Sequence, residues 1–328
     1  MRVNVSHVNT KKKREDGQIN MANISAKEVA ALRKKTGCGM MECKKALVEA
    51  DGDMDAAIKV LRERGLAVAA KKADRIAAEG IVDILTEDNA TAIIEVNSET
   101  DFVAKNETFQ TFVKNLLKVI LKNRPADLDA LNACAYPDSD MTVDEKVKDM
   151  IFTIGENMHI RRFQVIDGVV STYIHGKGSI GVVVTFDTDA DTAGKDAFKE
   201  MAKNVALQVA AMPVLYLNKE AVPASVLEEE KSVLMSQIKN DPKMASKPEQ
   251  IIEKMVLGRI GKYYEQNCLM EQEYVKDDKV TVGQYVQNTA KELGAQVKVT
   301  GFVRYERGEG LEKREENFAE EIAKMVNG

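Results

Sequence analysis

The residues of this chain that most suggest a chemical role are four consecutive ones, Thr100, Asp101, Phe102 and Val103. The apolar segment 91–97 before them is typical of a strand, and residues 106–121 after them have the spacing of an amphipathic helix. A corner between two such elements presents its side chains outward. It presents a carboxylate and an aromatic ring, with no adjacent His, Cys or Lys to complete a catalytic set. We therefore expect the corner to push on a partner protein.

Sequence motifs for other chemistry are missing. The chain has neither a G-x-x-x-x-G-K-[ST] phosphate loop nor a dinucleotide fingerprint. Its three histidines are far apart and have no nucleophile elbow nearby, and its four cysteines lack the spacing of a zinc site. Gly176 and Gly178 lie between two strand patterns, which favours a hairpin turn. We expect a protein that is not an enzyme and that has no catalytic residues, no metal site and no cofactor.

The composition of the 328 residues narrows the partner class. The chain is 44% hydrophobic and 30% charged, which is typical of globular proteins, and its net charge is −5. Basic and acidic residues are interspersed, so no broad basic field is available for direct nucleic-acid binding. No apolar run approaches the roughly 18 residues that span a bilayer, and no secretory signal is visible. We expect a cytoplasmic protein without membrane contact, whose cysteines are reduced thiols.

The N-terminal third divides into an extension and a small helical domain. Residues 1–20 look foreign to the rest of the chain, and Met21 has the appearance of a new start. We interpret residues 1–20 as an extension that is either a misassigned start or disordered. Residues 21–74 contain three short helical patterns and a connector, and Ser25 and Glu28 form a capping box for the first helix. We expect a three-helix, partner-docking domain there, with only a small core.

The central region repeats one order of elements, which predicts an α+β fold. A hairpin pattern at 80–86 and 91–97 is followed by a helix, an insertion, a second helix and a strand at 161–166. The same order recurs from strands at 169–175 and 180–186 to a closing strand at 297–305. We infer two related β-β-α…α-β core subdomains with helices on one face of each sheet. Their bounds are 75–167 for the first and 168–218 with 280–306 for the second.

The second insertion and the C-terminus predict two further modules. Two long helical patterns, 223–239 and 248–266, are separated by a proline-containing break. We expect residues 219–279 to form a protruding antiparallel helical hairpin, a coiled-coil arm. We expect residues 307–328 to form a C-terminal module that ends in a short helix, whose apolar stripe would comprise Phe318, Ile322, Met325 and Val326.

Spacing alone leaves two interpretations open for the residues singled out. Phe102 lies seven residues before Phe109, so a helix extended backwards would bury both on one stripe, although Lys105 and Asn106 interrupt that stripe. Met40 and Met41 point about 100° apart on a helix, so at least one packs in the core or an exposed one contacts a partner. His175, at a strand end, is most simply a surface residue.

The motifs of this chain resemble those of bacterial elongation factor Ts, the guanine-nucleotide exchange factor of elongation factor Tu. They occur in family order over about residues 22–328. The runs that carry the resemblance are L-R-K-K-T-G-C-G at 32–39 continuing into M-M-E-C-K-K-A-L at 40–47, E-V-N at 95–97, T-D-F-V at 100–103, I-G-E-N at 154–157, R-R at 161–162, H-G at 175–176, E-K-M-V at 253–256, G-R at 258–259, T-V-G-Q at 281–284 and V-T-G-F at 299–302. Residues 1–20 lie outside the resemblance.

The resemblance implies a fold, a partner and a mechanism. The domain at 21–74 would be ubiquitin-associated-like and the arm would be of a dimerisation type. Asp101 and Phe102, within Thr100–Val103, would intrude beside the magnesium site of elongation factor Tu and displace the metal, which promotes GDP release. The partner would be GDP-bound or nucleotide-free. Pairing through the arm would give a two-plus-two complex, and the stoichiometry stays open.

The same resemblance implies contacts away from the corner. Arg33, Met40 and Met41 would touch the GTP-binding domain of the partner, and His175 would touch its distal β-barrel region. Two rival classes remain. A scaffold or chaperone for ribosomal components would associate with a partner without accelerating nucleotide release. A hydrolase or transferase would need a pocket with convergent polar groups.

Overall fold

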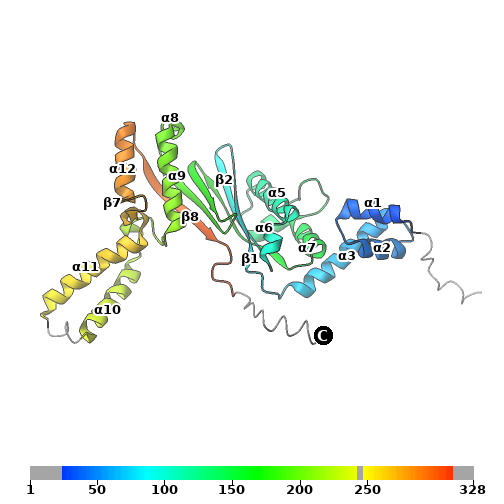
Figure 1. Cartoon of the computed structure of the whole chain (residues 1–328), viewed down its shortest axis with the longest axis horizontal. Coiled ribbons are helices and arrows are strands. Elements are labelled where there is room, and N and C mark those ends of the chain that lie inside the picture. The colour runs from blue at the N-terminus through cyan, green and yellow to red at the C-terminus, as the bar shows by residue number, and fades with distance from the viewer. Residues whose placement is uncertain (1–23, 242–246, 313–328) are drawn as a thin grey trace, which may run out of the picture. The chain divides into compact units, whose positions relative to one another are not determined.

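A computed structural model describes residues 24–241 and 247–312 of the chain. The predictions for residues 1–20 and for the C-terminal helix therefore concern residues outside the described ranges. The described residues form two compact units, one of residues 24–75 with 141–158 and one of residues 76–140 with 159–312. Helices and small antiparallel sheets occur together, which confirms the α+β class (Figure 1).

The first unit is helical, and its core is small. It consists of α1 (Ala26–Thr36), α2 (Met40–Glu49), α3 (Met54–Lys72) and α7 (Val143–Ile154). The predicted capping box is present, because Ser25 accepts from the Glu28 amide while the Glu28 carboxylate accepts from the Ser25 amide. The buried side chains that fill its centre are Val29, Leu32, Cys38, Cys43, Ala46, Leu47, Ala57 and Leu61, with Phe152 packed against them.

Helix α7 does not pack where its place in the sequence predicts. The sequence pattern groups it with residues 75–167, yet α7 contacts α3 and belongs to the same compact unit as the three N-terminal helices. Phe152 of α7 lies over Gly65 of α3, where an added Cβ would meet the Phe152 side chain at ordinary contact distances of 3.5–3.8 Å. The packing thus joins segments more than 80 residues apart, which local periodicity does not report.

The second unit contains two three-stranded antiparallel sheets. The first has the order β1 (Glu79–Glu87), β2 (Ala90–Ser98), β3 (Met158–Asp167), and the second β4 (Val169–His175), β5 (Ile180–Asp187), β8 (Lys298–Glu306). The six strands expected from the sequence are confirmed within one residue, except that β3 begins earlier. Both sheets have the strand order first-second-last.

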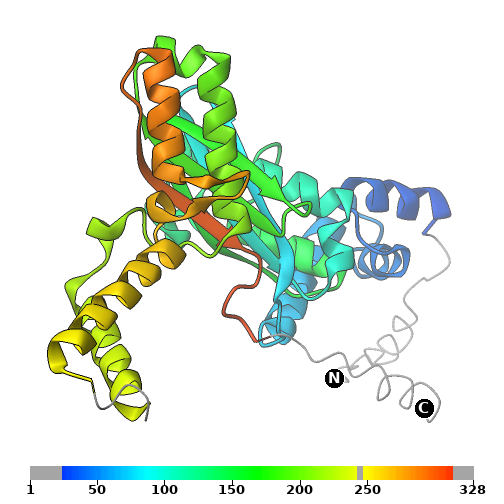
Figure 2. The ribbon, with the colours of Figure 1, turned by 60° about the vertical axis from the view of Figure 1, so that its left-hand side comes forward.

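The two sheets pack face to face, and helices cover their other faces. Val183 of β5 packs with Val82 and Ile93 of the first sheet, whereas its neighbours Val182 and Val184 belong to the core beneath the helices. This alternation follows from the two-residue period of a strand. Helix α5 (Glu107–Asn123) contacts β1 and β2, and α9 (Asp196–Ala211) lies on the second sheet beside α12 (Val282–Leu293) (Figure 2).

The remaining elements are the arm and several short segments. The arm consists of α10 (Ala224–Asn240) and α11 (Glu249–Asn267), which pack through Leu234, Ile238, Ile252, Val256 and Ile260 (Figure 1). Both helices agree with the predicted patterns. The short elements are α4 (Asp101–Ala104), α6 (Leu128–Ala133), α8 (Ala190–Gly194), β6 (Glu273–Tyr274), β7 (Asp277–Thr281) and the 3₁₀ turns Lys219–Ala221 and Leu269–Glu271.

Candidate functional site

The corner between β2 and α5 exposes Phe102. Helix α4 is a single turn that ends at Lys105, and Asn106 then starts α5 by accepting a hydrogen bond of 2.8 Å from the Thr108 amide. This break separates Phe102 from the buried stripe of α5. The ring of Phe109 is completely buried, whereas Phe102 is 78% exposed. The extended-helix interpretation is therefore wrong, and the outward corner is confirmed as a feature of the structure.

The other residues of the corner hold the turn in place. Val103 points inward and is buried, while Thr100 has an extended backbone and precedes the first helical residue. Asp101 forms an ion pair with Lys105, one helical turn later, and the Lys105 ammonium lies 5.7 Å from the centre of the Phe102 ring. The hydrogen bond from Lys105 lowers the pKa of Asp101.

Lys105 is a residue that the sequence interpretation missed. Asp101 was expected to have no neighbouring Lys, but an Asp and a Lys four residues apart share one face of a helix, and this spacing could have revealed the pair. The corner therefore presents an ion pair beside an aromatic ring.

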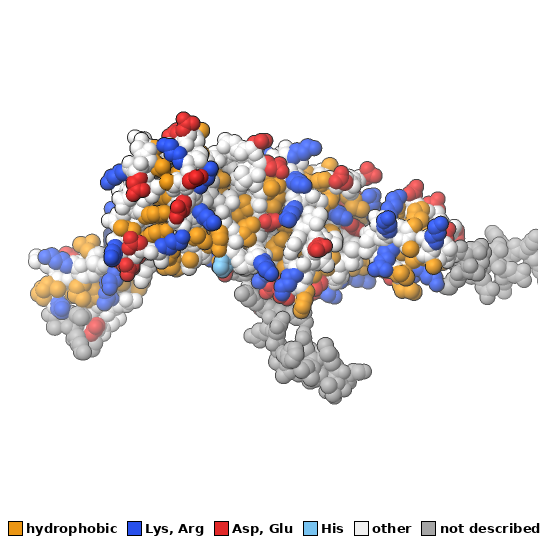
Figure 3. Space-filling model, turned by 45° about the horizontal axis from the view of Figure 1, so that its top comes forward, with side chains coloured by type: hydrophobic (Ala, Val, Ile, Leu, Met, Phe, Trp, Pro, Cys, Tyr) orange, Lys and Arg blue, Asp and Glu red, His pale blue; other side chains and the backbone are white. Residues whose placement is uncertain are grey.

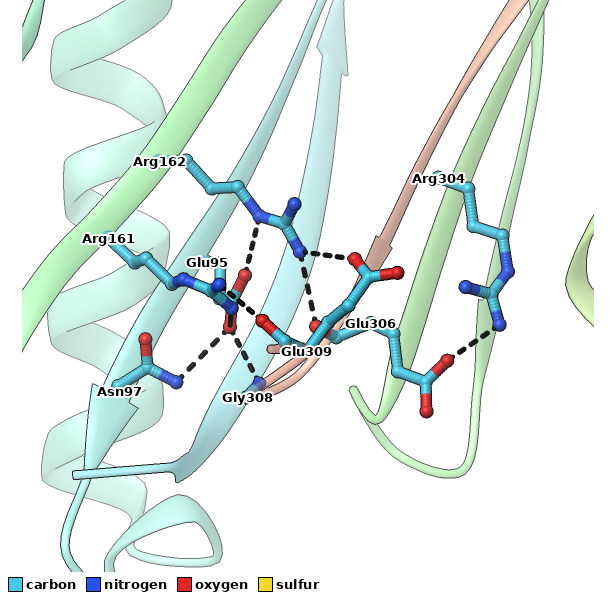
Figure 4. A network of polar contacts seen from close by, with 8 residues as sticks. All are labelled: Glu95, Asn97, Arg161, Arg162, Arg304, Glu306, Gly308 and Glu309. Atoms are coloured by element: carbon cyan, nitrogen blue, oxygen red, sulfur yellow. Dashed lines mark hydrogen bonds and ion pairs between the residues drawn. The ribbon is translucent and has the colours of Figure 1, made fainter. Parts of the chain in front are cut away.

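A buried carboxylate lies in the strand that leads to the corner. Glu95 of β2 has a fully buried side chain that accepts hydrogen bonds from four donors (Figure 4). They are Arg161 Nη1 at 3.0 Å, Arg162 Nε at 2.7 Å, the Gly308 amide at 2.8 Å and Asn97 Nδ2 at 3.2 Å. Burial alone would raise the pKa of Glu95, but the Gly308 amide and both guanidinium groups together lower it by more, so the net shift is downward.

Residues 307–309, which we call the strap, follow β8 and cross the end of the first sheet. Arg162 donates to the Glu306 carbonyl at 3.2 Å and to the Glu309 carboxylate at 3.1 Å, and Arg161 donates to the Glu309 carbonyl (Figure 4). Arg307 pairs with Glu79 at 2.8 Å, at the first residue of β1. The strap, which continues from β8 of the second sheet, is thus bonded to residues of all three strands of the first sheet.

The other predicted contact residues lie at the surface of their own units. Met40 and Met41 of α2 are both exposed, at 53% and 63%, and Arg33 of α1 is exposed as well. Of the two interpretations left open, core packing of a methionine is wrong, because Cys43 and Leu47 of the same helix fill the core. His175 is exposed at the end of β4, and its Nδ1 lies 3.0 Å from the Tyr173 hydroxyl.

The described surface and its cavities offer little to other chemistry. Basic and acidic side chains are intermixed over the face shown in Figure 3. Within residues 24–241 and 247–312, no cluster of His, Cys, Asp or Glu could hold a metal ion, and every helix there is too short or too polar to cross a membrane. A hollow of about 750 Å³ is lined by residues 124–129 and 161–165, with no nucleophile and base brought together in it.

Comparison with known proteins adds a family to this geometry. A family model described as Elongation factor TS matches residues 99–309, which include the corner, the arginine partners of Glu95 and the strap. The chain belongs to the elongation factor Ts family. Proteins of this family are nucleotide exchange factors for elongation factor Tu in translation elongation, and they are not catalytic enzymes in the usual sense.

Individual relatives of the same family match nearly the whole chain. Elongation factor Ts of Syntrophotalea carbinolica is 47% identical over 306 residues, covering 92% of this chain and 99% of the relative. The protein of the same name from Clostridium kluyveri is 47% identical over 311 residues, and that from Magnetococcus marinus is 47% identical over 308 residues. Each of these two matches covers 93% of this chain and 99% of the relative. The resemblance stated from the motifs is confirmed.

Proposed function

We propose that this chain binds elongation factor Tu in its GDP-bound or nucleotide-free form and promotes GDP release by inserting the corner beside the partner's magnesium site. The observation that carries the proposal is the 78% exposure of Phe102. Burying a Phe side chain contributes about 1.5–3 kcal/mol, so a ring left in water forgoes that stabilisation in the free protein. Insertion into a partner would recover it in the complex.

The mechanism we propose is a coupling between two ligands of one protein. If this chain weakens the partner's hold on GDP, GDP weakens the partner's hold on this chain by the same factor. Every tenfold weakening corresponds to about 1.4 kcal/mol. A bound Mg²⁺ is a large local charge that holds the phosphates of the nucleotide, so an inserted ring that displaces the ion removes a major part of the binding energy. No covalent step is required of this chain.

We also propose docking roles for the surfaces away from the corner. Arg33, Met40 and Met41, on the ubiquitin-associated-like helices of residues 21–74, would contact the GTP-binding domain of the partner. His175 would contact its distal β-barrel region. Exposed methionines suit such a contact because their flexible side chains adapt to a partner surface. A partner in translation implies that this chain acts in the cytoplasm.

A two-plus-two complex through the arm is part of the same proposal. Val233, Ile251 and Leu257 are exposed on α10 and α11, and Leu257 is 64% exposed. Apolar side chains left in water on a helical hairpin support pairing with a second arm. Light scattering of the complex at several concentrations tests this stoichiometry, since a single one-to-one mass at every concentration would contradict it.

The proposed exchange activity has a direct test. Purified elongation factor Tu loaded with a fluorescent GDP analogue is mixed with this chain in a stopped-flow instrument. We expect release to accelerate with the concentration of the chain until it saturates. Association without acceleration would contradict the proposal and would favour the scaffold class.

A further inference from the structure

We propose that Glu95 is a positioning residue for nucleotide exchange, because it clamps the strap against the end of the first sheet and so fixes where the corner presents Phe102. This inference rests on the proposed function of the corner. It concerns a residue that the partner protein would not contact, since the Glu95 side chain is fully buried.

Packing alone does not account for a charge at position 95. The neighbouring side chains of Ile93, Ile94 and Val96 are buried and apolar. A buried carboxylate is expensive unless donors surround it, and replacing a buried ion pair by apolar residues of similar volume is often neutral or stabilising. A carboxylate that gathers two guanidinium groups, a backbone amide and a side-chain amide is better explained by the geometry that it imposes than by stability.

The bonds of Glu95 continue to the corner along two routes. Asn97, which donates to Glu95, also donates to the Glu79 carbonyl at 3.0 Å. Beyond it, Ser98 donates to the Thr100 carbonyl at 2.9 Å, directly before α4. The first route therefore runs along β2 from the buried carboxylate to the residue that precedes Asp101.

The second route passes through the strap. The amide of Gly308 donates to Glu95. The next residue, Glu309, is bound by both arginines, and the residue before Gly308 is Arg307. Arg307 donates to the Gly80 carbonyl at 3.3 Å and pairs with Glu79, and α4 packs on this strand, β1. The Arg307 charge also acts on Asp101 and contributes to its lowered pKa, although less than Lys105 does. The strap therefore supports the end of the strand on which the corner rests.

Positioning of this kind matters for a wedge more than for a docking surface. A displacement of about 1 Å at a group that acts through geometry can reduce its effect about a hundredfold, whereas a broad contact surface tolerates such shifts. Loss of the clamp should therefore reduce the maximal rate of GDP release and leave the concentration at half-saturation nearly unchanged.

The experiment compares Glu95→Gln with wild type in stopped-flow GDP release over a range of concentrations. The substitution keeps the size of the side chain and removes its charge, so the charge-assisted bonds from Arg161 and Arg162 weaken. We expect a maximal rate reduced about tenfold and a half-saturating concentration changed less than about threefold. Asp167→Asn is the matched control. Asp167 lies in β3 of the same sheet and pairs with Arg124 at the end of α5, and these contacts do not include the strap. We expect wild-type kinetics for it.

A double variant separates positioning from a general loss of structure. If Glu95 acts through the ring, Glu95→Gln should reduce the rate little further in a chain that already carries Phe102→Ala. An unchanged maximal rate in Glu95→Gln, or full multiplication of the two defects, would overturn the inference. Wild-type kinetics of Phe102→Ala would instead contradict the proposed function of the corner, so the two failures are distinguishable.

A milder variant covers the case in which Glu95→Gln does not fold, as judged by circular dichroism. Arg161→Gln removes one of the four donors from a partly exposed position and leaves the charge pair with Arg162 in place. The same two criteria apply to it. A reduced maximal rate that is not multiplied by Phe102→Ala supports the inference, and an unchanged rate overturns it.

Discussion

At the scale of single residues, the corner combines one exposed ring with a locally paired carboxylate. The Asp101–Lys105 pair is exposed to solvent, so it contributes little to folding stability. Its more important effect is local, since it holds an ammonium group over the Phe102 ring. A partner would therefore meet the ring, the carboxylate and the ammonium together.

The buried Glu95 predicts a dependence of stability on pH. Its pKa is lower in the folded chain than the ordinary value of about 4.3, so the stability it adds is complete above that value and is lost as the pH falls through the folded pKa. We expect Glu95→Gln to be about 2 kcal/mol less stable at pH 7 and to approach wild type on acidification below about pH 4. Urea unfolding at pH 7, 5 and 3 measures this.

Other groups near Glu95 titrate in both proteins. His159, which burial shifts to a lower pKa and Glu95 partly shifts back, adds its own loss of stability on acidification. Tyr305 also faces the carboxylate, but its pKa is raised, so it stays neutral over this pH range. The relevant quantity is therefore the difference between the two proteins at each pH. A constant difference from pH 7 to pH 3 would contradict the assigned role of the Glu95 charge.

Sequence reasoning found the corner but could not find its support. The strand-corner-helix pattern around residues 100–103 is local and favoured an outward ring, although the spacing of Phe102 and Phe109 left burial of the ring open. Three of the four donors of Glu95 come from positions 66, 67 and 213 residues further along the chain. A charged residue inside the apolar run 91–97 and the adjacent Arg161 and Arg162 were visible, but only the sheet order brings them together.

At the scale of elements, the ends of helices were the most predictable features. The capping box of Ser25 occurs as expected, and Thr142 and Thr281 form capping boxes of the same kind, because the side chain and the amide that it caps are three residues apart. The break between α4 and α5 was harder to predict, since the apolar spacing there also fits one continuous helix. The packing of α7 on α3 could not be predicted, because the long interval between them hides which core the helix joins.

The strap predicts a sharp difference between two glycines. Gly308 and Gly310 both have left-handed backbones, with φ of 68° and 72°, but a Cβ at 308 would lie 2.1 Å from the Ala78 carbonyl oxygen and one at 310 meets nothing within 4 Å. Both alanine variants suffer the same backbone strain of about 1 kcal/mol. We expect Gly308→Ala to lower the thermal unfolding temperature well beyond Gly310→Ala.

The pair of variants is its own control. Equal unfolding temperatures for Gly308→Ala and Gly310→Ala would show that the strap does not press against the residue before β1. If the strap supports the corner, Gly308→Ala should also release GDP from the partner more slowly than Gly310→Ala does.

At the scale of the whole molecule, the residues proposed for docking and those proposed for insertion lie in different compact units. Met40 and Met41 belong to the first unit, and the corner, the strap and His175 belong to the second. The division suggests that affinity and rate can be altered separately. The sequence predicted a helical docking domain and a mixed core, while the membership of α7 in the first unit emerged only from packing.

The exposed methionines predict a loss of affinity without a loss of rate. Replacing both Met40 and Met41 by Ala removes side chains that stabilise no core, so folding should be unchanged. We expect the half-saturating concentration in GDP release to rise about tenfold, which corresponds to about 1.4 kcal/mol. The maximal rate should stay within about twofold of wild type.

An exposed residue of the next helix serves as the control for this variant. Leu66→Ala removes another exposed apolar side chain of the same unit, from α3. Equal affinities for the methionine variant, Leu66→Ala and wild type would exclude the first turn of α2 from the docking surface.

The most direct measurement is the rate at which Phe102→Ala releases a fluorescent GDP analogue from elongation factor Tu at saturating concentration. Val275→Ala, which truncates another exposed apolar side chain away from the corner, is the matched control. We expect Phe102→Ala to fold like wild type and to reduce the maximal rate at least tenfold, while Val275→Ala keeps it. A wild-type rate for Phe102→Ala would contradict the role of the ring in nucleotide release.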